Sequence, residues 1–115
     1  MELKDSKTMK NLFAAFAGES QAHTKYQYYA AKARENGFEQ IAFLFENVAK
    51  IEKEHEERYR KLISNINDGL VFSRDGDAIW QCRNCGHIFI GKGAPEICPV
   101  CSHAKAYFQI KPENY

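Results

Sequence analysis

The chain lacks the features that would assign it to a membrane, to export or to a nucleic acid. No apolar run approaches the ~20 residues that a membrane-spanning helix needs. The first residues, MELKDSKTMKN, have no apolar core of the kind that a secretory signal carries. The net charge of the 115 residues is only +1, so no strong general attraction to nucleic acid or to an anionic membrane is expected. These absences predict a cytoplasmic protein with no nucleic-acid or membrane partner.

Proline is absent from the first 94 residues, so nothing of that kind interrupts the helical patterns found there. We predict one long helix from Ser6 or Asp5 to about Asn36, and a second from near Phe38 to about Asn67. An Asn-Gly pair follows the first helix and supplies its stop. A turn this short makes the two helices antiparallel neighbours.

The second part of the chain has a different composition. All three prolines lie in its last 21 residues, and short β-like runs flank an Asp-Gly turn. A unit of roughly 35–40 residues seldom folds on its apolar core alone and usually needs a metal or disulfides. We predict a two-helix domain at 1–67, a linker at 68–78 and a small β-rich metal domain at 79–115.

Cysteine is absent before residue 82, and the four cysteines then come as two C-x2-C pairs separated by twelve residues. Two such pairs, Cys82 with Cys85 and Cys98 with Cys101, hold four thiolates tetrahedrally around one ion. This spacing suits metal binding by a reduced cytosolic protein better than a disulfide framework. The spacing alone leaves a structural zinc ribbon and a one-iron redox centre both open.

The motifs CRNCG and CPVC, with aromatic residues around them, resemble rubredoxin. The resemblance implies one iron per chain at the four cysteines, which would pass single electrons, with zinc as the alternative metal. The surrounding aromatic residues are expected to form the core of the small domain. They are Trp80, Phe89, Tyr107 and Phe108.

The second predicted helix carries two ionisable side chains in the middle of an apolar stripe. The residues of this stripe follow one another at steps of four and three, which is the spacing of one helix face. We predict that the stripe is the core-facing seam of the helix, where an unpaired charge is costly to bury. It consists of Ile41, Phe45, Val48, Glu52, His55, Tyr59, Leu62 and Ile66.

The first helix places a third side chain of this kind, Glu19, on its own seam. Glu19 precedes Gly37 by 18 residues and His55 follows it by 18, so both stand ~27 Å along their helices. Glu52 stands ~22 Å along the second helix, so the three side chains converge at one level. A single glutamate or histidine on an apolar face is usually an edge or a hydrogen-bonded core residue. Three at one level indicate a metal site.

The stretches FAGESQAHTKYQYY and ENGFEQIA, the E-x-x-H of the second helix and the trailing cysteine pairs look like rubrerythrin. Rubrerythrins carry a ferritin-like four-helix bundle of two similar hairpins, followed by a rubredoxin-like domain. This chain has only one hairpin. The resemblance therefore implies an all-α hairpin that completes a ferritin-like four-helix bundle by forming a homodimer, with assembly beyond the dimer left open. Two chains would then supply four glutamates and two histidines to one di-iron centre.

The resemblance also implies a role for each residue of the site. Glu52 bridges the irons or chelates one of them, His55 binds through a ring nitrogen, and Glu19 completes each half. Tyr26 matches a family tyrosine that hydrogen-bonds a ligand carboxylate, and its alternative is an ordinary core tyrosine.

The implied function is reduction of hydrogen peroxide or O2 at the di-iron centre, with electrons relayed from an external reductase by the cysteine-bound iron. One residue departs from the family pattern and bears on whether the peroxidase function applies to this chain. In the family's second hairpin a further glutamate follows the first-helix glutamate by three residues, and this chain has Ala22 there. His23 is an extra ligand, a proton donor or, more commonly, a satisfied core histidine.

Two alternatives to a peroxidase remain open at this stage. One is a ferroxidase or iron-handling protein, which the departure at Ala22 favours. The other is a non-catalytic zinc-ribbon dimerisation module, which the residue types support least, since a mere dimerisation seam would favour leucine at positions 19, 52 and 55.

Overall fold

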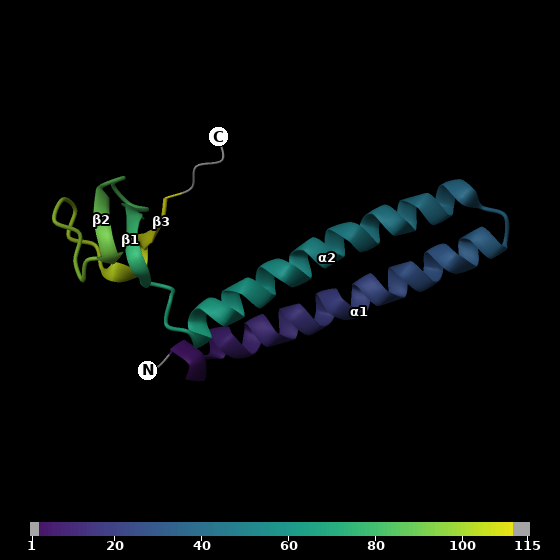
Figure 1. The fold of residues 1–115 in the computed structure, drawn as a ribbon, viewed down its shortest axis with the longest axis horizontal. Coiled ribbons are helices and arrows are strands. Elements are labelled where there is room, and N and C mark those ends of the chain that lie inside the picture. The colour runs from purple at the N-terminus through teal and green to yellow at the C-terminus, as the bar shows by residue number, and fades with distance from the viewer. Residues whose placement is uncertain (1–2, 112–115) are drawn as a thin grey trace. The chain divides into compact units, whose positions relative to one another are not determined.

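The computed structural model describes residues 3–111 and divides the chain into two compact units, Met1–Asn67 and Asp68–Tyr115. The first unit is a hairpin of two antiparallel helices, α1 (Lys7–Glu35) and α2 (Glu39–Asn67), each 29 residues long (Figure 1). A short 3-10 turn, η1 (Leu3–Asp5), precedes α1. The predicted helices are confirmed, with their ends displaced by about one residue. No helix within residues 3–111 is both long and apolar enough to cross a membrane.

Local sequence signals fix both ends of α1. The Ser6 hydroxyl accepts a hydrogen bond from the Met9 N–H at 3.1 Å, which caps the N-terminus of the helix. At the other end Gly37 adopts a φ of +85°, a conformation that glycine takes at little cost. The Phe38 N–H then reaches the Ala33 carbonyl at 2.9 Å, which closes the turn in a Schellman motif. The chain therefore reverses within three residues and starts α2.

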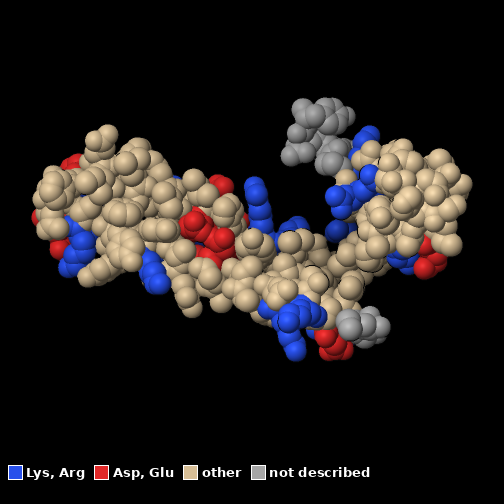
Figure 2. Space-filling model, turned by 180° about the vertical axis from the view of Figure 1, so that it is seen from behind, with Lys and Arg blue, Asp and Glu red and all other residues tan. Residues whose placement is uncertain are grey.

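Small side chains form the contact between the two helices. Ala30, Ala42 and Ala49 are at most 2% exposed, and they let the helix axes approach closely. Charged side chains of both signs are scattered over one face of the hairpin, with broad neutral areas between them (Figure 2). The hairpin therefore buries little large apolar surface within one chain.

The apolar stripe of α2 is only partly covered by α1, which corrects part of one prediction. Phe45 of the stripe stacks on Tyr26 of α1, and His55 lies 3.5 Å from Glu19, but other members of the stripe stay open. Ile41 and Leu62 are each 47% exposed. The side chains that α2 buries are instead Ala42, Ala49 and Glu56, which recur every seven residues. Successive residues are ~100° apart around a helix, so the stripe that contains Ile41 lies on the face next to the buried one. Ile41, Val48 and Leu62 form the open part of this seam in the single chain.

Glu56 is a buried carboxylate that the sequence pattern does not single out. It is only 4% exposed, and its Oε1 accepts hydrogen bonds from Arg60 Nη2 at 2.9 Å and from Lys53 Nζ at 3.5 Å. The Arg60 guanidinium also lies 5.2 Å from the centroid of the Phe16 ring on α1. The side chains of Arg60 and Lys53 are 61% and 43% exposed, so the buried charge is paired by cations that remain hydrated.

The second unit is a three-stranded antiparallel sheet with the strand order β2-β1-β3. Its elements are β1 (Ser73–Cys82), β2 (Ile88–Gly93), the 3-10 turn η2 (Lys105–Tyr107) and β3 (Phe108–Ile110). The core consists of Trp80, Cys82, Ala94, Cys98 and Phe108. β1 begins within residues 68–78, the stretch expected to be a linker.

The predicted aromatic core of this unit is half right. Trp80 and Phe108 are buried, and the Trp80 indole donates a hydrogen bond to the Gly91 carbonyl at 3.0 Å. Phe89 and Tyr107 are instead 39% and 43% exposed. A sheet this small has only one side to cover, and two cysteines of the metal site take much of that space.

We expect the Arg60→Ala variant to lower the free energy of unfolding by about 1–3 kcal/mol, because the buried Glu56 carboxylate loses its closer partner. The Glu56→Met variant should lower the free energy of unfolding by a smaller amount, because it leaves only exposed cations unpaired. Denaturant unfolding followed by helical circular dichroism measures both effects. Lys61→Ala, on the exposed face of α2, is the control and should stay within about 0.5 kcal/mol of the parent. Equal losses for Arg60→Ala and Lys61→Ala would contradict this account.

Candidate metal centres

The two cysteine loops have the same backbone hydrogen bonds. In the first loop the Gly86 N–H donates to the Cys82 carbonyl at 2.9 Å, and the Cys82 N–H donates to the His87 carbonyl at 2.9 Å. In the second loop, the Ser102 N–H and the Cys98 N–H make the corresponding bonds at 2.9 and 2.8 Å. The two loops are therefore matching knuckles that present their thiols to each other.

The sulfur positions fit a closed tetrahedral site. Cys82 Sγ lies 3.7 Å from Cys101 Sγ, and Cys85 Sγ lies 3.6 Å from Cys98 Sγ. A tetrahedron with metal–sulfur bonds of ~2.3 Å has edges of roughly 3.8 Å, whereas a disulfide bond is ~2.05 Å long. All four sulfurs lie within 4.8 Å of one another. The predicted set of four cysteines therefore comes together with the geometry of a metal site.

Cys101 and Cys85 have pKa values shifted in opposite directions. A hydrogen bond from the Asn84 side chain, and then one from the His103 backbone N–H, lower the pKa of Cys101 to about 5. The His87 backbone N–H also lowers the pKa of Cys85, but desolvation and the neighbouring thiols outweigh it and raise that pKa to about 12. Four adjacent thiolates repel one another, so a bound cation is what would hold all four in the ionised form.

Residue Ser102 carries backbone strain that its counterpart Gly86 avoids. Ser102 has a φ of +65° and Gly86 a φ of +85°. This left-handed region costs an L-residue roughly 1–2 kcal/mol. No atom lies within 4 Å of a Cβ built on Gly86, so a side chain there would meet only the backbone penalty.

We expect Ser102→Gly to raise the unfolding free energy of the metal-loaded small domain by about 0.5–1 kcal/mol, and Gly86→Ser to lower it by about 1 kcal/mol. Guanidinium unfolding followed by the metal–thiolate absorbance measures both. Gly76→Ser is the matched control, because Gly76 also has open space around it and no positive φ. Opposite signs for the two knuckle variants support the strain at Ser102, and a destabilised Ser102→Gly would refute it.

The helical hairpin brings its three predicted ligands together. Ligand atoms of Glu19, Glu52 and His55 all lie within 4.8 Å of one another. His55 Nδ1 stands 3.5 Å from Glu19 Oε1. Glu19 Oε2 is buried and has no hydrogen-bond partner in the described part of the chain. Two carboxylates, one with an unpartnered buried oxygen, and an imidazole fit a hard or borderline cation such as iron.

Tyr26 and His23 lie on the same face of α1 and make other contacts. The Tyr26 ring stacks on Phe45, with centroids 6.1 Å apart, and meets the edge of Tyr29 at 5.9 Å. Among the described residues no hydrogen bond joins the Tyr26 hydroxyl to the ligand carboxylates. His23 Nδ1 donates to the Ala49 carbonyl at 2.8 Å, so this ring nitrogen is satisfied within the hairpin. Within one chain, both residues therefore act as core residues.

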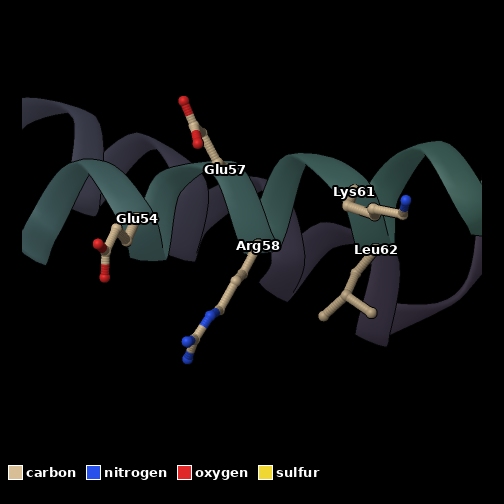
Figure 3. Close-up of a pocket in the computed structure, with 5 residues that line it drawn as sticks. All are labelled: Glu54, Glu57, Arg58, Lys61 and Leu62. Atoms are coloured by element: carbon tan, nitrogen blue, oxygen red, sulfur yellow. The ribbon is translucent and has the colours of Figure 1, made fainter. Parts of the chain in front are cut away.

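An open space on the surface of α2 contains none of the predicted ligands of the hairpin. It measures about 690 Å³ and is lined by Glu54, Glu57, Arg58, Lys61 and Leu62. All five residues come from α2, and Figure 3 shows their side chains spreading from one helix rather than converging. Glu54 and Gln21 are exposed, as expected for residues off the seams. This space is a surface of α2 and carries no ligand set.

A helical hairpin with a carboxylate–histidine cluster, followed by a four-thiolate domain, defines a non-haem metalloprotein with two kinds of centre. Residues 10–82 match the family model described as Rubrerythrin, and residues 80–109 match that of the rubrerythrin rubredoxin-like domain. The chain belongs to the rubrerythrin family. The predicted resemblance is thereby confirmed, as is the fold of a ferritin-like hairpin and a rubredoxin-like domain.

The chain is similar to several curated relatives. It is 47% identical over 109 residues to the rubrerythrin of Porphyromonas gingivalis. The aligned residues cover 94% of this chain and 54% of that protein. It is 44% identical over 109 residues to the rubrerythrin of Nitratidesulfovibrio vulgaris, with coverage of 94% and 57%. The chain thus spans about half the length of the curated relatives it matches. Rubrerythrin-type function is supported at the level of the family.

Proposed function

We propose that two copies of this chain form a homodimer that shares one di-iron centre and reduces hydrogen peroxide or O2. Each copy would contribute Glu19, Glu52 and His55, so the complete site would hold four glutamates and two histidines. The four cysteines of each chain would hold one further iron. The protein would then be an oxidoreductase of rubrerythrin type that works in the reduced cytoplasm, where thiolates persist.

The observation that carries this proposal is the incomplete ligand cluster on the hairpin. Glu19 Oε2 is buried without a partner among the described residues, and a carboxylate oxygen left unpaired in this way is costly to bury. A cation bound by three side chains of one chain still lacks ligands. A second chain related by a two-fold axis supplies the same three and covers the half-exposed His55, whose side chain is 41% exposed.

Bound iron would supply the redox chemistry, two electrons for O–O bond cleavage in the shared centre and single-electron transfer at the four thiolates. The chain's own residues would orient the metals and move protons. Glu52 and His55, three residues apart on α2, set two ligands toward one point. His23 has its Nδ1 committed to the Ala49 carbonyl, which leaves Nε2 as the ring nitrogen that can exchange a proton. The Tyr26 hydroxyl is the second candidate proton donor.

An external reductase would feed electrons to the cysteine domain. Cys82 and Cys98 are buried, whereas Cys85 is exposed at the surface of the knuckle. One side of the thiolate centre is therefore reachable by a partner, and the buried side is insulated from water. The exposed side suits electron uptake from another protein.

A ferroxidase is the second candidate function, and Ala22 favours it. The family's further glutamate, which assists peroxide chemistry, has no counterpart at this position, and a two-fold axis would repeat the alanine in both halves. Addition of Fe2+ and O2 that yields ferric product without peroxide turnover would identify this activity.

We expect Glu52→Ala to lower the rate of peroxide reduction by about a hundredfold or more, because it removes two ligands from each shared centre. The measurement is peroxide consumption by iron-loaded dimer, together with the iron content of the bundle. Glu54→Ala, two residues away on the exposed face, is the matched control and should keep the parent rate. A Glu52→Ala dimer with full activity would show that the helical cluster is not catalytic.

The Cys98→Ser variant tests the electron relay separately. It should keep single-turnover oxidation of a chemically reduced bundle by peroxide, because the helical ligands are unchanged. Steady-state turnover from a reductase should fall at least about tenfold, since one of four thiolate ligands is lost. Val100→Ser, in the same loop at an exposed position, is the control. Parent steady-state rates in Cys98→Ser would refute a relay through the cysteines.

A further inference from the structure

We infer that His23 is a positioning residue for the helical metal site, because it ties the ligand-bearing turn of α1 to that of α2. Its ring Nδ1 lies 2.8 Å from the Ala49 carbonyl oxygen on the other helix. A carbonyl oxygen only accepts, so Nδ1 carries the hydrogen and donates it. This inference rests on the metal site proposed above and adds to it what holds the ligands of the two helices at their separation.

The hydrogen bond lies close to the ligands along both helices. His23 follows Glu19 by four residues, and Ala49 precedes Glu52 by three. At 1.5 Å per residue, the bond stands about 6 Å along α1 from Glu19 and about 4.5 Å along α2 from Glu52. A tie at this height limits how far Glu19 can shift relative to Glu52.

The apolar contact between the helices does not by itself fix their register along the axis. Ala30, Ala42 and Ala49 form this contact, and the dispersion attraction between their methyl groups has little directional preference. A hydrogen bond, in contrast, weakens steeply when its angle departs from linearity. The bond from His23 therefore adds the directional constraint that the alanine contact lacks.

The Ala49 carbonyl belongs to the backbone turn that carries Glu52. In a regular α-helix such as α2 the carbonyl of residue 49 accepts from the N–H of residue 53, and its second lone pair is open to the His23 donor. The imidazole thus holds the backbone from which Glu52 projects, rather than a side chain that could rotate away. This is the kind of outer contact that orients metal ligands.

A weaker contact lies on the other side of the cluster. Phe16 precedes Glu19 by three residues, and the Arg60 guanidinium lies 5.2 Å from the centroid of its ring. The Arg60 side chain is 61% exposed, and an exposed cation–π contact is weak. Of these two contacts beside the ligands, the bond from His23 is the more constraining one.

Removal of the imidazole donor should weaken metal binding at the hairpin. We expect His23→Leu, which fills the space with an apolar side chain, to raise the Kd for Mn2+ about tenfold or more. His23→Asn should stay within about threefold of the parent, because its amide nitrogen can replace Nδ1 as the donor. The measurement is a titration of the full chain, with its cysteine sites filled by zinc, followed by the electron paramagnetic resonance of free Mn2+. Manganese prefers carboxylate ligands to thiolates, so it reports on the hairpin.

The Ser6→Ala variant separates positioning from a general loss of stability. Ser6 caps α1 at a point 13 residues before Glu19, so its removal should destabilise the hairpin and leave the Kd for Mn2+ at the parent value. Denaturant unfolding of each metal-free variant gives the stabilities for comparison. Affinities that follow stability across the variants, rather than the presence of a donor at position 23, would overturn the positioning role.

The failure of this inference is distinguishable from failure of the metal site. A parent chain that binds manganese at the hairpin, with the same Kd in His23→Leu, would overturn the positioning role alone. A parent chain that binds no manganese would overturn the helical metal site and this inference with it. If His23→Leu loses its helical circular dichroism, His23→Gln takes its place. Its longer side chain carries the amide nitrogen past the Ala49 carbonyl and should raise the Kd in the same way.

Discussion

The helical ligand cluster centres on the partly buried carboxylate of Glu19, whose side chain is 22% exposed. Its Oε2 has no partner within the described hairpin, and His55 approaches its other oxygen no closer than 3.5 Å. An unpaired buried carboxylate is stable only if it is protonated, hydrogen-bonded or bound to a cation. The convergence of Glu52 and His55 on the same point favours a bound cation. The helix lengths, the alanine contact and the open seam all place this one cluster at the middle of a long hairpin.

The two units of this chain compensate for a small apolar core in different ways. The hairpin buries mainly alanines between its helices and leaves several larger apolar residues exposed. The cysteine domain closes its core with Trp80, Phe108 and two buried thiols, and the metal joins its two knuckles. Neither unit has a large apolar core, so under the proposed function metal binding and association would contribute the missing stability. The proposed ligands would then serve both folding and function.

Much of this was predictable from the sequence because the signals are local or periodic. The helix ends follow from Ser6 and Gly37, the knuckles from the C-x2-C spacing, and the cluster from equal counts to the turn. The sequence did not predict that the contact of α2 with α1 centres on alanines beside the apolar stripe, because alanines carry a weak hydrophobic signal. The burial of Glu56 was not predicted, because it depends on which face of α2 packs against α1. The φ of Ser102 is also set by its knuckle, since serine gives no sign of a left-handed backbone.

The most direct test of the shared centre is the native mass of protein produced with iron and without air, combined with its iron content. The account predicts a dimer with two irons per chain, one at the cysteines and half of a shared pair. A visible ferric–thiolate spectrum should account for only half of the iron. A species with one metal per chain, whatever its mass, would contradict the account and leave an electron carrier or a zinc ribbon on a helical hairpin.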